Sequence, residues 1–217
     1  MNNWERLVWN QREALLAGLQ VTIEVCLISF AAAIACGMAL CLIRMYVKPL
    51  RPVAIVLIEF FRGTPILVQL LWVYYVLPIV FGVRIESLVA LVIGLSLYQG
   101  AFISEVYRSG IQSVPRGHSE AAQVLGLTSL QNFRRIVLPQ AIRMTLPPLA
   151  SNFVQLIKFS SLGAVISVSE ITRRGMELSA TNFRPLETFT FIAVVYFVIC
   201  WPLAMGIRLW ERRLQAR

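Results

Sequence analysis

The sequence predicts an all-α membrane protein with five transmembrane helices, an N-terminus outside the cytoplasm and a C-terminus inside it. The chain is too apolar for a soluble domain, because 58% of its 217 residues are hydrophobic, 14% are charged and its mean hydropathy is +0.71. Five apolar runs are long enough to cross a bilayer, and the basic residues between them gather on alternate sides. The spans are expected at about residues 15–43, 53–80, 87–103, 146–168 and 188–207.

The first two spans differ in their regularity. The first carries one charge, Glu24, near its start, and the small residues between Ala31 and Gly37 allow another helix to pack closely. The second is interrupted by Arg62-Gly63-Thr64-Pro65. A Gly and a Pro in mid-span open the backbone hydrogen-bond ladder, so this segment predicts either a stretch that lines a cavity or a simple kink.

A long polar segment separates the third predicted span from the fourth. The loop between the third and fourth spans, about residues 107–143, cannot lie in the bilayer because it contains Glu120, Arg134 and Arg135. A second, shorter polar loop separates the fourth span from the fifth. Because the spans and loops use the whole length, a single membrane domain is expected over residues 1–217.

The basic residues give the orientation. Five spans place the termini on opposite sides, and the positive-inside rule assigns the more basic side to the cytoplasm. One side holds Arg44, Lys48, Arg51, Arg108, Arg116, Arg134, Arg135, Arg143, Arg208, Arg212, Arg213 and Arg217. The other side holds Arg6, Arg12, Arg84, Arg173, Arg174 and Arg184, which nearby Glu residues balance. The loop after the third span is therefore expected in the cytoplasm, and topology explains the net charge of +9 better than nucleic-acid binding does.

This cytoplasmic loop is expected to form two short helices over about residues 115–139. The first follows Pro115, with Glu120 in its first turn, where the helix dipole favours an anion. Gly126 suits its C-terminal cap, because glycine readily adopts the left-handed conformation that ends many helices. The small Ala121-Ala122 pair leaves one face of this helix flat, so another surface could approach closely.

The second short helix is expected to open at Thr128, because Gln131 follows at the spacing of a capping box. It is expected to stop at Pro139, which has no backbone N–H to continue a helix. An ordinary interfacial helix hairpin would show the same punctuation, so these signals alone leave the role of the pair open.

Polar side chains inside the spans are candidates for a solute pathway, and interhelical hydrogen bonding is the alternative for each of them. On the fourth span, amides, hydroxyls and one cation recur along one face and could hold a carboxylate and an ammonium group together. A buried Lys158 would need an acceptor such as Glu24 or Glu59. The candidate pathway residues are Arg62, Thr64, Asn152, Gln155, Lys158 and Ser160.

Two pairs of opposite charges occur at helical spacing in the predicted spans, Glu59 with Arg62 in the second and Glu105 with Arg108 at the cytoplasmic end of the third, and structural ion pairs are expected for both. The sequence argues against catalytic or metal chemistry. It contains no Asp, its one histidine is His118, and its four cysteines show no metal-ligand spacing. No catalytic residues and no metal site are therefore predicted in this chain.

The cytoplasmic loop carries a specific pattern. Glu120-Ala121-Ala122 is followed after three residues by Gly126, and after nine more by Ile136-x-Leu138-Pro139. This resembles, in residues and spacing, the loop by which ABC importer permeases contact their ATP-binding subunit. The wider chain, over about residues 14–212, is similar to the polar amino acid uptake branch (the histidine, glutamine, arginine and opine type). The further matches are residues 61–69, 105–111, 138–141 and 146–149, with Asn152 and 158–162 matching more weakly.

The resemblance implies a permease subunit of an ATP-driven amino acid importer in a bacterial inner membrane, working by alternating access. It implies that Glu120, Ala121, Ala122 and Gly126 couple the chain to the ATPase. The implied partners are a dimer of ATP-binding subunits, which bind ATP and Mg, a second permease subunit (the same chain or a homologous one), an extracytoplasmic solute-binding protein, an amino acid and membrane lipid. No cofactor is implied in this chain, and ATP hydrolysis belongs to the partner, so the chain itself is not an enzyme.

Two positions depart from the family pattern. Phe159 stands where the family usually has an acidic residue after the lysine, and His118 stands where the family commonly has Gln. The first departure argues against a basic amino acid bound in this subunit, and it also fits a partner half whose companion binds the solute. The alternatives are a permease for methionine, an opine or a similar solute, and a membrane channel or scaffold without ATP coupling.

Overall fold

The computed structural model describes residues 12–215, and over this range the chain forms helices and no strands. Four helices are long and apolar enough to cross a membrane, and a bent pair of helices supplies a fifth candidate span. The predicted all-α membrane class is therefore confirmed. Arg6, Arg217 and the other calls on residues 1–11 and 216–217 lie outside the described residues.

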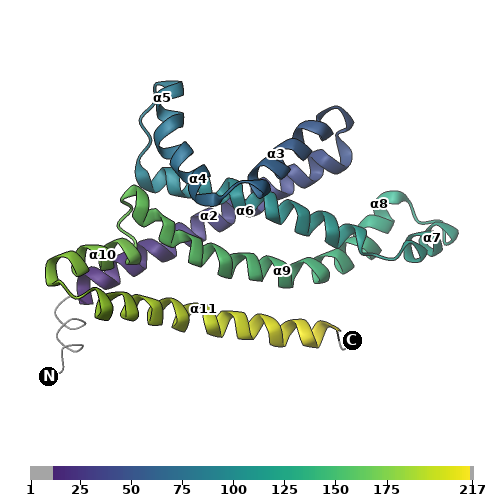
Figure 1. The fold of residues 1–217 in the computed structure, drawn as a ribbon. Helices are drawn as coiled ribbons and strands as arrows, with labels where there is room; N and C mark the ends of the chain where they lie inside the picture. Colours follow the sequence, from purple (N-terminus) through teal and green to yellow (C-terminus); the bar gives the residue numbers. More distant parts are fainter. Residues whose placement is uncertain (1–11, 216–217) are drawn as a thin grey trace.

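Four long helices form the body of the molecule (Figure 1). Helix α2 (Arg12–Tyr46) packs along α6 (Ser87–Gln112), α6 packs along α9 (Leu138–Phe159), and α11 (Pro185–Gln215) lies beside α9. Helix α2 approaches α6 closely at Gly37, where a Cβ atom would lie only 2.8 Å from the carbonyl oxygen of Gly100. The run of small residues in the first span thus provides the close packing that it predicted.

Gly37→Ala is expected to destabilise the fold. The added methyl group would meet a backbone oxygen, which cannot rotate away, so the free energy of unfolding should fall by about 1–3 kcal/mol. The measurement is the midpoint of thermal unfolding in detergent. Gly206→Ala is the matched control, because a Cβ there meets no atom within 4 Å. An equal change in both variants would contradict a specific contact between α2 and α6.

The second predicted span is bent. The turn η1 (Lys48–Leu50) and α3 (Arg51–Gly63) form its first arm, and the second arm, α4 (Ile66–Leu71), η2 (Trp72–Val76) and α5 (Leu77–Phe81), leaves it at 108°. The two arms form a V above α6 (Figure 1). Proline keeps its predecessor out of the helical region, and Thr64 before Pro65 is extended, with φ −115° and ψ 148°. The interruption predicted within the span over 53–80 is therefore present, as a sharp bend between two helical arms.

The other predicted spans differ from the structure mainly at their ends. Helix α6 runs past residue 103 to Gln112, and α11 extends beyond 188–207 in both directions. Helix α9 starts before residue 146 and ends at Phe159, after which the chain forms the 3-10 segment η4 (Ser160–Ile166) and the short helix α10 (Ile171–Asn182). Hydropathy marks only the apolar part of a helix, whereas backbone hydrogen bonds continue into its polar turns.

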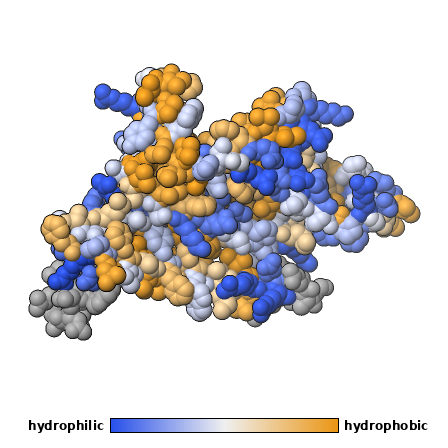
Figure 2. Space-filling view, viewed as in Figure 1, coloured by the Kyte–Doolittle hydropathy of each residue, from blue (hydrophilic) through white to orange (hydrophobic). Residues whose placement is uncertain are grey.

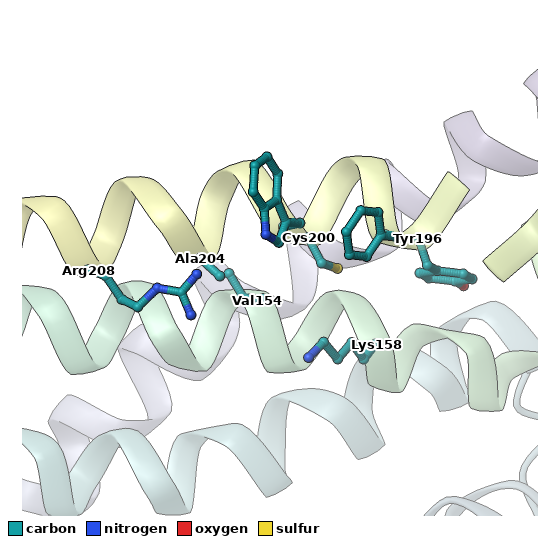
Figure 3. Close-up of a pocket in the computed structure, with 8 residues that line it drawn as sticks. Val154, Lys158, Tyr196, Cys200, Ala204 and Arg208 are labelled. Carbon is teal, nitrogen blue, oxygen red and sulfur yellow. The ribbon is translucent and has the colours of Figure 1, made fainter. Parts of the chain in front are cut away.

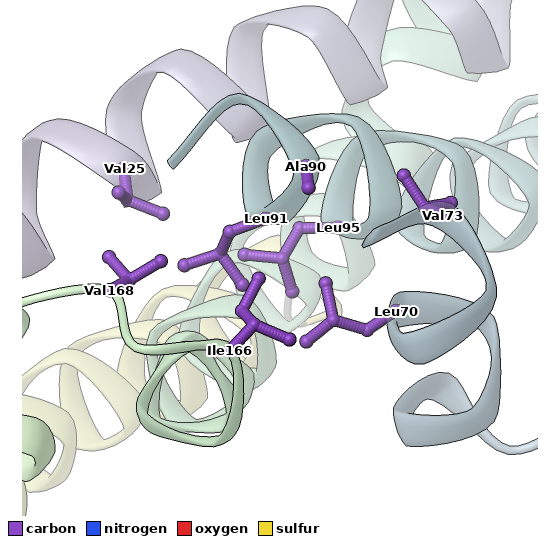
Figure 4. Packing of buried hydrophobic residues seen from close by; sticks show 8 residues of the cluster. All are labelled: Val25, Leu70, Val73, Ala90, Leu91, Leu95, Ile166 and Val168. Carbon is purple, nitrogen blue, oxygen red and sulfur yellow. The ribbon is translucent and has the colours of Figure 1, made fainter. Parts of the chain in front are cut away.

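An apolar cluster joins the bent span to the body of the protein. Val25 of α2, Leu70 of α4, Leu91 and Leu95 of α6, and Ile166 of η4 all point into it (Figure 4). Each of these side chains is at most 2% exposed. This cluster fixes the second arm of the V on α6.

The polar segments lie at opposite ends of the molecule. Helices α7 (Arg116–Val124) and α8 (Ser129–Asn132) project at one end, towards which the C-terminal part of α11 also runs, and α10 lies at the other (Figure 1). In the space-filling view the α4–α5 arm is largely apolar, whereas polar residues gather around α7 and α8 (Figure 2). A projecting polar helix pair is thus available for contact with another protein.

Candidate functional site

The turn between α7 and α8 is built around Gly126. Its φ is +75°, a left-handed conformation that favours glycine. The Gly126 N–H donates to the Gln123 carbonyl at 2.9 Å, and the Leu127 N–H donates to the Ala122 carbonyl at 3.0 Å. These are the two bonds of a Schellman cap, so the predicted role of Gly126 as a helix cap is confirmed.

The first helix begins earlier than expected. Pro115 is its N-cap, and α7 starts at Arg116, so Glu120 lies in the second turn and not in the first. The predicted dipole interaction of Glu120 is therefore wrong, because that effect fades beyond the first turn. Glu120 and Ala121 are exposed, whereas Ala122 is 1% exposed. Since α7 contacts α8 and the following segment η3, the small Ala122 side chain serves the packing of the pair.

The second helix begins as predicted. Thr128 accepts a bond from the Gln131 N–H at 3.3 Å, and the Gln131 side chain accepts one from the Thr128 N–H at 2.9 Å. The predicted stop at Pro139 is wrong, since the chain continues through the π-helical turn η3 (Phe133–Val137) into α9. Proline fits the first turn of a helix, and the widened π turn before it gives its ring room.

Three apolar side chains near this turn are exposed, which the sequence reasoning missed. Val124 is 88% exposed, Leu125 is 79% exposed and Leu130 is 65% exposed. They flank the Gly126 turn at the polar end of the molecule. The sequence did contain a signal for this exposure, because apolar residues stand beside the glycine cap of an otherwise polar loop. They give the helix pair an apolar tip that can bury surface against a partner.

An ion-pair cluster lies at the base of the projecting end. Arg108 donates to Glu105 at 2.7 Å, which confirms the predicted pair, and Arg44 of α2 forms a second ion pair with the same carboxylate. The Glu105 side chain is only 17% exposed. The cluster ties the end of α2 to the part of α6 that leads into α7. The contact of Arg44 spans 61 residues, so local spacing could not predict it.

A groove of about 350 Å³ lies between α9 and α11. In Figure 3, Lys158 of α9 and Arg208 of α11 both point into it. Neither cation forms an ion pair with a carboxylate in the described part of the chain. A buried Lys158 was expected to need Glu24 or Glu59 as an acceptor, but Lys158 is exposed and does not require one. The groove is lined by Val154, Lys158, Tyr196, Phe197, Cys200, Trp201, Ala204 and Arg208.

The other candidate residues of α9 and η4 do not line this groove. Asn152 is 9% exposed, and its side chain donates to the Pro148 carbonyl at 2.9 Å. The backbone carbonyl of Asn152 accepts a hydrogen bond from the Gln99 side chain. Gln155 is exposed on the helix surface. Ser160 is fully buried and donates to the Ile157 carbonyl at 2.7 Å. The structure thus brings only Lys158 of this set to the groove, together with residues of α11 that the sequence did not single out.

The candidates at the break in the second span have partners within the chain. Arg62 lies 3.5 Å from Glu59, as predicted, and 5.5 Å above the ring of Phe102. The Thr64 hydroxyl donates to the Phe60 carbonyl at 2.8 Å. These contacts stabilise the break itself, and a role of Arg62 and Thr64 in a solute pathway stays a prediction.

Glu170 forms a buried anchor at the opposite end from α7. It is fully buried and caps α10, accepting from the N–H groups of Thr172 at 2.8 Å and Arg173 at 2.7 Å. The Tyr196 hydroxyl of α11 donates to the same carboxylate at 3.3 Å. Burial raises the pKa of Glu170, and these hydrogen bonds oppose the rise. Glu170 therefore joins α10 to the helix that lines the groove.

Among the described residues, no group of three or more His, Cys, Asp or Glu side chains is placed to hold a metal ion. His118 instead lies 3.1 Å from the Gln140 side chain, which links α7 to α9. The cysteines at 26, 36, 41 and 200 are free thiols.

Residues 29–216 match the family described as binding-protein-dependent transport system inner membrane component. The chain is 36% identical over 210 residues to the glutamine transport system permease protein GlnP of Escherichia coli, covering 96% of each chain. It is 37% identical over 213 residues to the L-cystine transport system permease protein TcyB of Bacillus subtilis, covering 97% of this chain and 91% of TcyB.

Solved structures agree with these sequence matches. The chain superposes with a TM-score of 0.89 and 33% identity on a structure described as an amino acid ABC transporter with histidines, over 94% of this chain and 95% of that one. It superposes with a TM-score of 0.70 on the inward-facing MetNI methionine ABC transporter, covering 100% of this chain and 99% of that one. At 18% identity the second likeness shows the fold alone.

Proposed function

Because the chain belongs to the family of binding-protein-dependent transport system inner membrane components, we propose that it is the permease subunit of an ATP-driven amino acid importer. The observation that carries this proposal is the projecting α7–Gly126–α8 pair, which combines the Glu120-Ala121-Ala122 pattern with an exposed apolar tip. The tip docks on an ATP-binding subunit. The motion of the tip is passed to α6, which precedes the helix pair in the chain, and to α9, which follows it.

The assembly follows from this role. A dimer of ATP-binding subunits binds ATP and Mg and hydrolyses the nucleotide, a second permease subunit completes the pathway, and an extracytoplasmic binding protein delivers the amino acid. The α7–α8 end and the C-terminus face the cytoplasm, and the N-terminus faces the opposite side. The distribution of basic residues supports this orientation.

The groove between α9 and α11 is the proposed solute site of this subunit. Lys158 can bind the carboxylate of an amino acid through a charge-assisted hydrogen bond. Among the residues that the structure describes, no carboxylate lines the groove to hold a cationic side chain. We therefore propose a substrate with a neutral side chain, in keeping with the glutamine and L-cystine systems named for the two relatives.

Purification and uptake test the function. The tagged chain is extracted from native membranes in mild detergent, its partners are identified, and the complex is placed in liposomes with ATP and a panel of amino acids. We expect a stoichiometric ATP-binding subunit and ATP-dependent uptake of a neutral amino acid. Recovery of the chain without an ATPase would overturn the importer proposal in favour of a channel or scaffold. Uptake of methionine or an opine alone would overturn the substrate class.

Lys158→Met is expected to raise the KM for uptake. Loss of one charge-assisted hydrogen bond, about 1.5–3 kcal/mol, corresponds to roughly a ten- to hundredfold increase. The measurement is the initial rate of uptake against solute concentration. Lys48→Met is the matched control, because Lys48 is exposed in η1, far along the chain from the groove. An unchanged KM for Lys158→Met would remove this lysine from the site.

A further inference from the structure

Gln69 reaches back across the break in the second span. It lies in α4, is 6% exposed, and its side-chain Nε2 contacts three acceptors on the far side of Pro65. The distances are 2.8 Å to the Phe61 carbonyl, 3.1 Å to the Thr64 carbonyl and 2.6 Å to the Thr64 hydroxyl oxygen. One side chain therefore connects the end of α3 with the start of α4.

These contacts answer a problem that the break creates. Where a helix stops, its last carbonyl groups lose their N–H partners, and inside a bilayer each unpaired group is costly. The Thr64 hydroxyl donates to the Phe60 carbonyl, and Gln69 supplies donors to the Phe61 and Thr64 carbonyls. Because the Thr64 hydrogen is used on Phe60, its oxygen is free to accept from Gln69. The result is a short chain of hydrogen bonds from α4 to α3.

Only the donor half of the Gln69 amide is used. Its Oε1 is buried and has no hydrogen-bond partner among the described residues. The neighbouring Leu70 is 2% exposed and packs in the apolar cluster against α6 (Figure 4). The start of α4 is thus fixed on α6 by Leu70 and fixed on α3 by Gln69. What this position requires is a side chain that donates.

The backbone alone would leave the break free to flex. A Cβ atom at Gly63 would meet no atom within 4 Å, so the chain is not closely packed on that side of the residue. Glycine also permits more backbone conformations than any other residue. Both arms also pack on α6, and the Gln69 contacts are side-chain hydrogen bonds that join one arm directly to the other.

We propose that Gln69 is a positioning residue for transport, which clamps α3 to α4 so that the bent span moves with α6 as one body. It does not contact the solute. This inference rests on the proposed transport function for its kinetic consequence, although the clamp itself can be measured without it. The clamp is expected to convert a movement of α6 into a movement of both arms.

The test uses the complete transporter in liposomes and a Gln69→Glu substitution, whose carboxyl group has at most one O–H donor and so cannot replace the two N–H groups that face three acceptors. We expect kcat for uptake to fall about tenfold while KM stays within about twofold, because coupling is lost and solute binding is kept. The matched control is Gln112→Glu. Gln112 is exposed and only accepts a bond from Arg108, which a carboxylate can also do.

A second measurement follows the angle directly. Spin labels at the exposed positions Val56 and Ile79, one on each arm, report their separation in a chain whose four cysteines are replaced. We expect a broader distance distribution in Gln69→Glu than in the wild type. Gln69→Met, which has a similar size and no donor, is the second variant if Gln69→Glu does not assemble, and it should broaden the distribution as well.

The outcomes separate the possible roles of Gln69. A raised KM with unchanged kcat and an unchanged distance distribution would make Gln69 a solute contact and overturn the clamp. An unchanged distribution in either assembled variant would overturn it whatever the kinetics. If the wild type took up no amino acid, the proposed function would fail, and the distance measurement would still decide whether the clamp exists.

Discussion

Gly126→Pro is expected to abolish transport while leaving membrane insertion intact. Gly126 has a φ of +75°, whereas proline is held near −65°, and its N–H donates to Gln123, a bond that proline cannot make. A mismatch of about 3 kcal/mol or more would lower the population of the native turn about a hundredfold. The angle between α7 and α8 would be lost with it, and so would the surface proposed for the ATPase.

Two further variants show whether the turn geometry is responsible. Gly126→Asn should keep a substantial part of the uptake, because asparagine tolerates the left-handed conformation better than other residues with a Cβ. Gly117→Ala, in the first turn of α7, should transport as the wild type does, since a Cβ there meets no atom within 4 Å. The measurements are ATP-driven uptake and the amount of ATPase that co-purifies. Normal uptake by Gly126→Pro would refute a role of this turn in coupling.

Local patterns in this chain predicted local structure well. The capping box of Thr128 and the glycine cap at Gly126 depend on residues three to five apart, so the sequence contains all that they need. The same holds for the ion pairs within one helix, Glu59 with Arg62 and Glu105 with Arg108. Proline misled at residue 139, because its effect depends on whether the preceding turn can widen.

Contacts between distant segments could not be predicted in the same way. Whether Arg62-Gly63-Thr64-Pro65 gives a small kink or a bend of 108° depends on what holds the two arms, and Gln69 and the cluster on α6 decide that. The groove depends on how α11 lies against α9, so Lys158 was found and its companions Tyr196 and Arg208 were not. Periodicity gives the face of a helix but not the helix that it meets.

Loss of the Glu170 side chain is expected to lower the free energy of unfolding strongly, because this one buried carboxylate accepts hydrogen bonds from two helices. Glu170→Ala removes the cap of α10 and leaves the Tyr196 hydroxyl without this acceptor. The loss should be about 2–4 kcal/mol, from a helix cap and a buried hydrogen bond to a carboxylate together, while the Tyr196 hydroxyl keeps its contact with the Thr172 hydroxyl. The measurement is the midpoint of thermal unfolding in detergent. Glu177→Ala is the control, since Glu177 forms only ion pairs with Arg173 and Arg174 near the surface of the same helix.

The pH dependence of stability gives an independent test of the same carboxylate. Burial raises the pKa of Glu170 in the folded state, so over the range between the ordinary and the raised value the folded chain binds the proton that the unfolded chain has released. Stability should therefore fall as the pH rises through this range, starting near the ordinary glutamate value of about 4.3. Glu170→Gln keeps the volume and one acceptor oxygen and cannot titrate. As the pH rises through this range, the unfolding midpoint of the wild type should therefore fall relative to that of Glu170→Gln. This comparison separates Glu170 from every other acid in the chain. A difference that does not change with pH would mean that the hydrogen bonds from α10 and Tyr196 fully offset the burial of the charge.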